Sequence, residues 1–242
     1  MKATSFHRGL LLSLAAVTLA ALPAMAQDGG SAGAGASKIT FKVPLRGAPK
    51  MRVGGGVRSI DSLDVALSVL APEESGLTTS SSPTLYWYLS ETVTDPVEIA
   101  VTDITSLQAA AEPLIEVSLP APVARGIHGF DLSERAVALK AGVEYQWIVA
   151  VVRDPEQRSK DVIAGGTVIY TAASDELRDR LSQHGQTQPA VVLAEAGIWY
   201  DAVDALSRRI AQNPGDRESR NLRAQLLEQV GLSEAAAYDR GS

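Results

Sequence analysis

The sequence contains no cysteine among its 242 residues, and it contains only three histidines. A chain without cysteine cannot form disulfides, so its stability must come from a buried core. The same absence excludes a lipid-modified N-terminal cysteine. Structural zinc sites use three or four nitrogen or sulfur ligands, which two scattered histidines after the N-terminal segment cannot supply. We therefore predict no bound metal and no cofactor.

Several catalytic motifs are also missing. There is no G-x-S-x-G nucleophile elbow, no P-loop and no G-x-G-x-x-G that opens a helix. We assign no catalytic residue and predict a protein without enzymatic activity. A carboxylate-based hydrolase stays open as the least favoured alternative, because paired carboxylates need only spatial proximity. The loop carboxylates that could serve are Glu73, Glu74, Asp154, Glu156 and Asp161.

Long apolar runs are absent after the first 26 residues. Leu10–Leu22 is apolar but short, follows a basic start and is followed by Ala24-Met25-Ala26. This pattern predicts a signal peptide over residues 1–26, cleaved near Ala26. We expect a periplasmic or secreted product with no membrane span.

Acidic side chains outnumber basic ones, and the formal net charge is −6. This balance argues against nucleic-acid binding. Between Lys38 and Ile60, however, there are basic residues and no acidic one. Glycines in this arm allow backbone N–H groups to approach an anion, so an anion-binding arm is one interpretation, and a solvated arm that pairs with the acidic surface is the other. Its candidate ligand-binding residues are Arg46, Lys50, Arg52 and Arg58.

Residues 27–37 are a Gly-, Ala- and Ser-rich flexible linker, and residues 38–172 read as a β-sandwich domain. The expected strands begin with residues 39–43 and 63–69, and they continue with 83–89, 97–101, 114–119 and 127–132. A long hairpin, 143–152 with 162–170, completes the set, with Gly165-Gly166 expected as a bulge. Short strands separated by Gly, Pro and Ser are typical of a sandwich or barrel.

The lead-in Leu139-x-x-Gly142-x-x-Tyr145 is similar to the tyrosine corner of immunoglobulin-like domains, where a tyrosine hydroxyl contacts upstream backbone. The predicted fold class is therefore mainly β, an immunoglobulin-like antiparallel sandwich followed by a small helical region. Tyr86 and Tyr88 share the outer face of one strand. They are candidate ligand-binding residues for a sugar or peptide, although cross-strand packing is the more common role of such aromatics.

After residue 172 the apolar period changes to that of helices, which are expected after Ser174 and over 189–196, 199–212 and 217–230. Gly197-x-Trp199-x-x-Ala202 with Asn213-Pro214 is similar to one tetratricopeptide-repeat helix. A single unit predicts one helical hairpin within residues 173–242, docked on the sandwich or on a partner. Trp199 and Tyr200 are its candidate partner-binding residues.

Four stretches occur in the order found in a known family: residues 44–49 with 54–56, 82–88, 142–147 with 154–155, and 197–202 with 226–232. With these motifs the chain resembles the bacterial domain-of-unknown-function family 928. The resemblance implies an exported all-β domain with a helical C-terminal part and names no activity. We thus expect an exported, non-enzymatic module that binds an envelope or secreted protein. The alternative is a binder of an anionic glycan or another anionic ligand through the basic arm.

Overall fold

The computed structural model describes residues 38–44, 65–105, 112–184 and 188–242. All of them belong to one compact unit, Ala36–Ser242. The predicted signal peptide and linker lie outside the described residues, so the expectations for residues 1–37 stay predictions.

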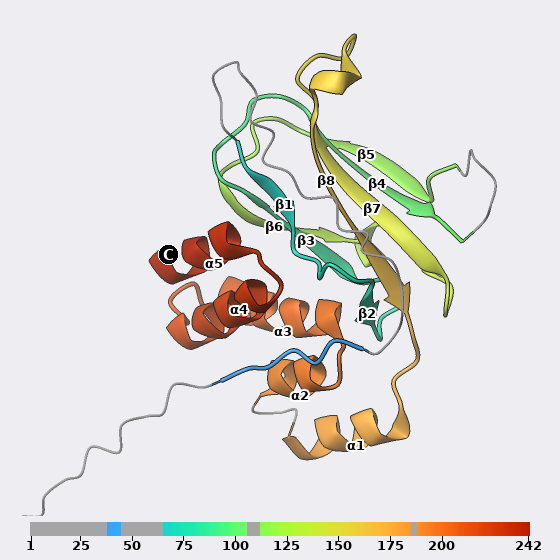
Figure 1. The fold of residues 1–242 in the computed structure, drawn as a ribbon, viewed down its shortest axis with the longest axis vertical. Coiled ribbons are helices and arrows are strands. Elements are labelled where there is room, and N and C mark those ends of the chain that lie inside the picture. The colour runs from blue at the N-terminus through green and yellow to red at the C-terminus, as the bar shows by residue number, and fades with distance from the viewer. Residues whose placement is uncertain (1–37, 45–64, 106–111, 185–187) are drawn as a thin grey trace, which may run out of the picture. The chain divides into compact units, whose positions relative to one another are not determined.

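Eight strands within the described residues form two sheets, in the order β1-β3-β6 and β2-β8-β7-β4-β5 (Figure 1). The strands are β1 (Leu67–Val69), β2 (Gly76–Thr78), β3 (Thr84–Leu89), β4 (Val97–Asp103), β5 (Ile115–Leu119), β6 (Gly126–Asp131), β7 (Glu144–Val151) and β8 (Val162–Tyr170). Neighbouring strands are antiparallel, except that β2 runs parallel to β8. The β-rich, two-sheet part of the prediction is confirmed.

The period-two pattern of the sequence places the core between the sheets. Trp147 and Val149 of β7 and Trp87 of β3 are at most 1% exposed, and each faces inward with the residues two positions away. Tyr145 begins the inward series of β7, and its hydroxyl accepts a 3.1 Å hydrogen bond from the backbone N–H of Lys140. The expected contact of this tyrosine with upstream backbone is therefore present.

The predicted bulge at Gly165-Gly166 is wrong. β7 and β8 pair without interruption through Trp147↔Gly166 and Ile148↔Gly165. A Cβ atom on Gly166 would lie 2.7 Å from the Cβ of Ala71 and 3.4 Å from Cγ2 of Val69. Glycine is therefore needed here for the close approach of the two sheets, and not for a change in register.

Strand β2 was not expected from the sequence. It has three residues and follows Pro72 and a polar stretch, so it carries no alternation long enough to detect. Its pairing to β8 is parallel and non-local, with Leu77 opposite Ile169. Such a strand is determined by its partner rather than by its own sequence.

Five α-helices follow the last strand in the described residues. They are α1 (Asp175–His184), α2 (Pro189–Glu195), α3 (Trp199–Gln212), α4 (Arg217–Gln229) and α5 (Ser233–Gly241). The first four match the predicted helices, and the Ser174 hydroxyl accepts the N–H of Leu177 as the expected cap. Helix α5 was missed, because its buried positions are alanines and one aspartate rather than an apolar stripe.

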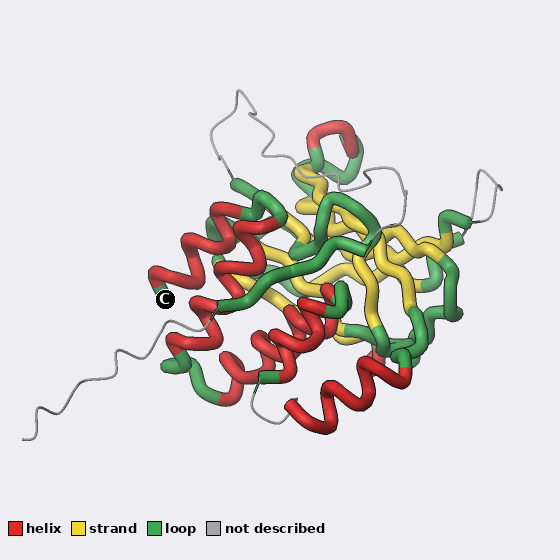
Figure 2. The backbone as a smooth tube through the Cα atoms, turned by 60° about the horizontal axis from the view of Figure 1, so that its bottom comes forward, coloured by secondary structure: helices red, strands yellow, loops and turns green. Residues whose placement is uncertain are grey.

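Each helix from α2 onward packs against the next one in the chain, and together they form a layer on one side of the strands (Figure 2). Helix α3 contacts β2 and β3, and α5 contacts β6. The helical region therefore packs against the chain's own three-stranded sheet and against β2 at the edge of the five-stranded sheet. The helical share of the fold is larger than the small tail that the sequence predicted.

Residues 38–44 do not form the first strand of a sheet, contrary to the prediction. Their alternation is real, since Ile39 and Phe41 are buried while Lys38 and Thr40 are exposed. Their backbone partners, however, are helical residues: Ile39 N–H donates to Gln225 Oε1 at 3.3 Å. Figure 1 shows this segment in blue, passing across the helices. A period-two burial pattern predicts an extended backbone, but it does not identify the surface against which the apolar side chains are buried.

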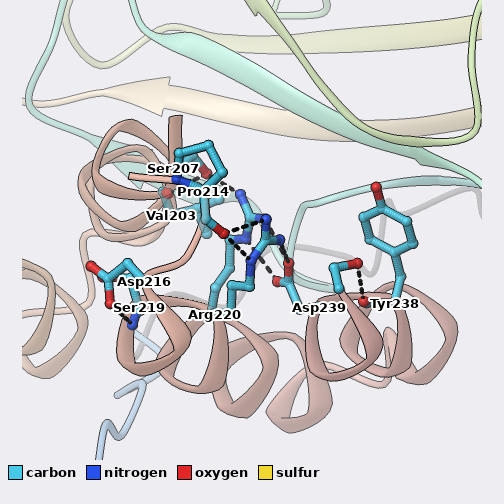
Figure 3. A network of polar contacts seen from close by, with 10 residues as sticks. Val203, Ser207, Pro214, Asp216, Ser219, Arg220, Tyr238 and Asp239 are labelled. Carbon is cyan, nitrogen blue, oxygen red and sulfur yellow. Dashed lines mark hydrogen bonds and ion pairs between the residues drawn. The ribbon is translucent and has the colours of Figure 1, made fainter. Parts of the chain in front are cut away.

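A buried ion pair between Arg223 and Asp239 joins α4 to α5, and Figure 3 shows the polar contacts around Asp239. Arg223 donates to both carboxylate oxygens of Asp239, with Nε–Oδ2 at 2.8 Å and Nη2–Oδ1 at 2.6 Å. Its third nitrogen, Nη1, donates to the Ser207 hydroxyl at 2.8 Å, and that hydroxyl donates to the Val203 carbonyl on α3. The network therefore links three helices through one guanidinium group.

Candidate binding site at the helix–sheet seam

Trp199 and Tyr200 begin helix α3, and their side chains are 0% and 1% exposed. The Trp199 Nε1–H donates to the Leu70 carbonyl at 2.8 Å. The Tyr200 hydroxyl accepts from Trp147 Nε1 and donates to the Thr167 carbonyl, both at 2.9 Å. These predicted partner-binding residues are therefore buried, and their hydrogen bonds fix α3 to both sheets.

Replacing Tyr200 with phenylalanine should lower the free energy of unfolding by about 1–3 kcal/mol, because two buried polar groups lose their partner. Trp147 Nε1 would lose its acceptor, and the Thr167 carbonyl would lose its donor. Urea denaturation measures the change. Tyr170→Phe is the matched control at a partly exposed strand end, and an equal loss in both variants would contradict the assigned hydrogen-bond role.

Tyr86 and Tyr88 lie on the face of β3 that the helices cover. The Tyr86 hydroxyl donates to Asp204 Oδ1 of α3 at 2.9 Å. Burial, followed by the nearby Asp204 carboxylate, raises the pKa of Tyr86, so it stays a neutral donor. Tyr88 is 3% exposed, and its ring centroid lies 5.6 Å from that of Tyr238 on α5. The two rings therefore pack beneath the helices. This packing replaces the predicted stacking of Tyr86 and Tyr88 on a ligand.

The remaining candidates belong to the basic arm. Arg46, Lys50, Arg52 and Arg58 lie outside the described residues, so the structure says nothing of an anion site there. The hairpin carboxylates Asp154 and Asp161 lie in the turn between β7 and β8. Asp161 Oδ2 is 2.7 Å from Arg158 Nε, and Asp154 Oδ2 is 3.7 Å from Lys160 Nζ, so both are paired within the turn.

A cavity of about 420 Å³ lies where the serine-rich loop before β3 meets α2 and α3. Pro83, Leu193, Ala205 and the ring of Tyr200 give it apolar walls, and Ser80 and Arg208 add polar groups. Two of the motif stretches identified in the sequence, residues 82–88 and 197–202, meet at this place. We call it the seam cavity. Its volume lies within the range usual for ligand pockets, about 300–1,000 Å³.

The two carboxylates of the seam cavity are engaged in holding the fold. Asp201 accepts from Thr78 Oγ1 at 2.5 Å and from the backbone N–H and hydroxyl of Thr79. Asp204 accepts from Tyr86, and its Oδ2 lies 2.7 Å from Arg208 Nε. Each carboxylate oxygen therefore already has a donor, and the arrangement suits contact with an apolar group better than proton transfer.

Sequence reasoning missed the seam cavity because its walls come from three separate segments. One signal was available: Asp201 and Asp204 are three residues apart on a helix and so share a face. A second cavity, of about 550 Å³, lies between the end of β3 and α5 and is lined in part by Tyr88, Arg125 and Tyr238. Among the described residues, no three His, Asp or Glu side chains gather as metal ligands would.

No helix within the described ranges has the length and apolar character needed to cross a membrane. None of the curated proteins compared with the chain matches it. Among solved structures, the chain is similar to Astrotactin-2, a conserved vertebrate-specific and perforin-like membrane protein involved in neuronal development, with 10% identity and a TM-score of 0.30. That match covers 73% of this chain and 34% of the other, so the chain spans about a third of that protein's length.

The family comparison covers most of the sequence. A model described as Domain of Unknown Function (DUF928) matches residues 53–239, which include both motif stretches of the seam cavity. The resemblance drawn from the sequence motifs is therefore confirmed, and the chain belongs to the DUF928 family.

Proposed function

We propose that this chain is an exported, non-enzymatic module that binds a protein of the cell envelope at the seam cavity. One observation carries the proposal: an apolar cavity of about 420 Å³ opens between the sheet and the helices, and both of its carboxylates are already hydrogen-bonded. Apolar pockets with a few polar groups at their edge are where partner side chains contribute most to binding. The N-terminal sequence supports a periplasmic or secreted location.

The proposal includes an immunoglobulin-like sandwich as the scaffold. The Tyr145 hydroxyl contact to Lys140 and the inward position of Trp147 two residues later support this class. In such a scaffold the loops carry the recognition, and here the serine-rich loop before β3 supplies one wall of the cavity.

Ala205→Trp tests the site, because this partly exposed wall residue of α3 can be enlarged into the cavity. A photo-cross-linking residue placed at Ser82, on the opposite wall, should yield one main adduct in intact cells. Ala205→Trp should reduce that adduct at least about tenfold, which corresponds to the loss of a central interface contact worth about 1.4 kcal/mol or more.

Two controls separate binding from folding. Ala237→Trp adds the same side-chain volume at the wall of the second cavity and should leave the adduct unchanged. Thermal unfolding of both variants should match that of the natural chain. An adduct that is insensitive to Ala205→Trp, in a variant that folds normally, would remove the seam cavity as the binding site.

A further inference from the structure

Residues 38–44 lie on the helical layer in the manner of a bound peptide. The Phe41 N–H donates to Gln229 Oε1 at 2.9 Å, and Gln229 Nε2 returns a bond to the Ile39 carbonyl at 3.1 Å. Lys42 N–H donates to the Ala194 carbonyl of α2 at 3.1 Å. Gln225 and Gln229 are four residues apart on α4, so both amides face the segment. Helix side chains thus satisfy main-chain groups that a sheet would otherwise satisfy.

Two side chains of the segment are buried against the helices. Ile39 is 2% exposed and Phe41 is 8% exposed, and the Phe41 ring meets Trp199 edge to face at 4.8 Å. Lys38, Thr40 and Lys42 are exposed. The contacts therefore define a short motif, two apolar residues with one residue between them, and leave the other positions unspecified.

The turn between α2 and α3 is shaped to admit this backbone. Gly197 has φ +79°, and a Cβ atom there would lie 2.9 Å from the Lys42 carbonyl and 3.0 Å from Pro44 Cγ. A side chain at this position would therefore both strain the turn and push the segment away. The surface made by Gln225, Gln229, Trp199, Ala194 and Gly197 is called the peptide groove below.

We propose that the peptide groove is a recognition surface for an extended polypeptide of the apolar-x-apolar type, and that residues 38–44 are its tethered resident ligand. Gln225 and Gln229 are separated from their hydrogen-bond partners in the segment by 186 to 190 positions in the chain. Recognition acts mainly on the main chain, so a partner needs only two suitably spaced apolar side chains. This surface uses residues other than those that wall the seam cavity, and its test does not depend on the proposed function.

A tethered ligand competes with any partner at an effective concentration on the order of millimolar. The natural chain should therefore bind an external peptide weakly, and disabling the resident segment should increase the apparent affinity. The resident segment would in this way set the minimum affinity that a partner peptide needs in order to displace it.

Fluorescence anisotropy with a labelled, end-capped peptide of residues 38–44 tests the proposal. The receptor is the full chain carrying Ile39→Ser and Phe41→Ser, which cannot seat its own segment well. We expect this variant to bind the peptide at least about tenfold more tightly than the natural chain, because the internal competitor is lost. A peptide with serine at both apolar positions should not bind.

Groove variants locate the binding. Gln229→Ala in the resident-disabled chain should weaken peptide binding severalfold, while Gln212→Ala, an exposed glutamine at the end of α3, should leave it unchanged. The proposal is overturned if the folded double variant fails to bind the peptide, or if it binds the serine peptide equally well.

A second measurement applies if the double variant does not fold. In the natural chain, a large excess of the peptide should accelerate hydrogen exchange at the Phe41 and Lys42 amides, because their acceptors are occupied by the added peptide. Unchanged exchange of these two amides in saturating peptide would show that residues 38–44 are a fixed part of the fold, and it would refute the proposal.

Discussion

Asp239→Ala is expected to lower the free energy of unfolding by about 3–5 kcal/mol, because it leaves a buried charge without its partner. The Asp239 side chain is 0% exposed and that of Arg223 is 5% exposed. The carboxylate accepts two short hydrogen bonds from this guanidinium group. Removing the carboxylate therefore leaves both buried N–H donors without an acceptor. Urea denaturation, with the m-value checked for two-state unfolding, measures the loss.

Two further variants separate the buried pair from ordinary ion pairing. Glu228→Ala removes the exposed partner of Arg240 in the same pair of helices and should change stability very little. Replacing both members of the buried pair, as Arg223→Met with Asp239→Leu, should recover part of the lost stability, because the buried Arg223 charge is removed together with its partner. Arg220, which lies 3.7 Å from Asp239, keeps its hydrogen bonds to the Pro214 carbonyl in this variant. A double variant as unstable as Asp239→Ala would show that the network is needed for more than charge compensation.

Trp199→Ala is expected to lower the free energy of unfolding by about 3–5 kcal/mol, the range for removing a buried aromatic side chain. The ring is 0% exposed, contacts Phe41 and donates to the Leu70 carbonyl. The variant would open a cavity where the peptide segment, helix α3 and the three-stranded sheet meet. Thermal and urea unfolding should agree on the size of the loss.

Leu114→Ala is the control for this substitution, because Leu114 is 39% exposed and loses little burial. Trp199→Phe should have an intermediate effect, since it keeps most of the apolar contact but leaves the buried Leu70 carbonyl without its donor. A Trp199→Ala variant as stable as the control would contradict the core role of this residue. It would favour instead the surface role in partner binding that the sequence pattern predicts.

Much of the local structure could be predicted from the sequence. Alternating apolar residues identified seven of the eight described strands, and the change to a helical period identified α1 to α4. Period and capping residues act through neighbours in the chain, so they are visible without a fold. β2 and α5 were not visible, because one is a three-residue strand and the other buries alanines and Asp239.

The site candidates were less predictable, for a physical reason. Tyr86, Tyr88, Trp199 and Tyr200 are large amphipathic side chains, which suit an interface between two proteins and an interface between two layers of one protein equally well. Their sequence environment is the same in both cases. Here the helical layer covers Tyr86 and Tyr88, and Asp204 and Tyr238 of that layer supply their partners. Trp199 and Tyr200 belong to the layer itself and are buried against the strands.

The sequence by itself determined the periods, the caps, the absence of disulfides and the family of the chain, because each depends on residue identity and spacing alone. The tertiary structure decided against which sheet or helix each apolar side of the chain is buried. Residues 38–44 show the difference: their alternation requires an extended segment with one buried side, yet both a strand and a helix layer can bury it. The choice depended on Gln225 and Gln229, nearly two hundred residues away, whose amides supply the hydrogen bonds that a neighbouring strand would have made.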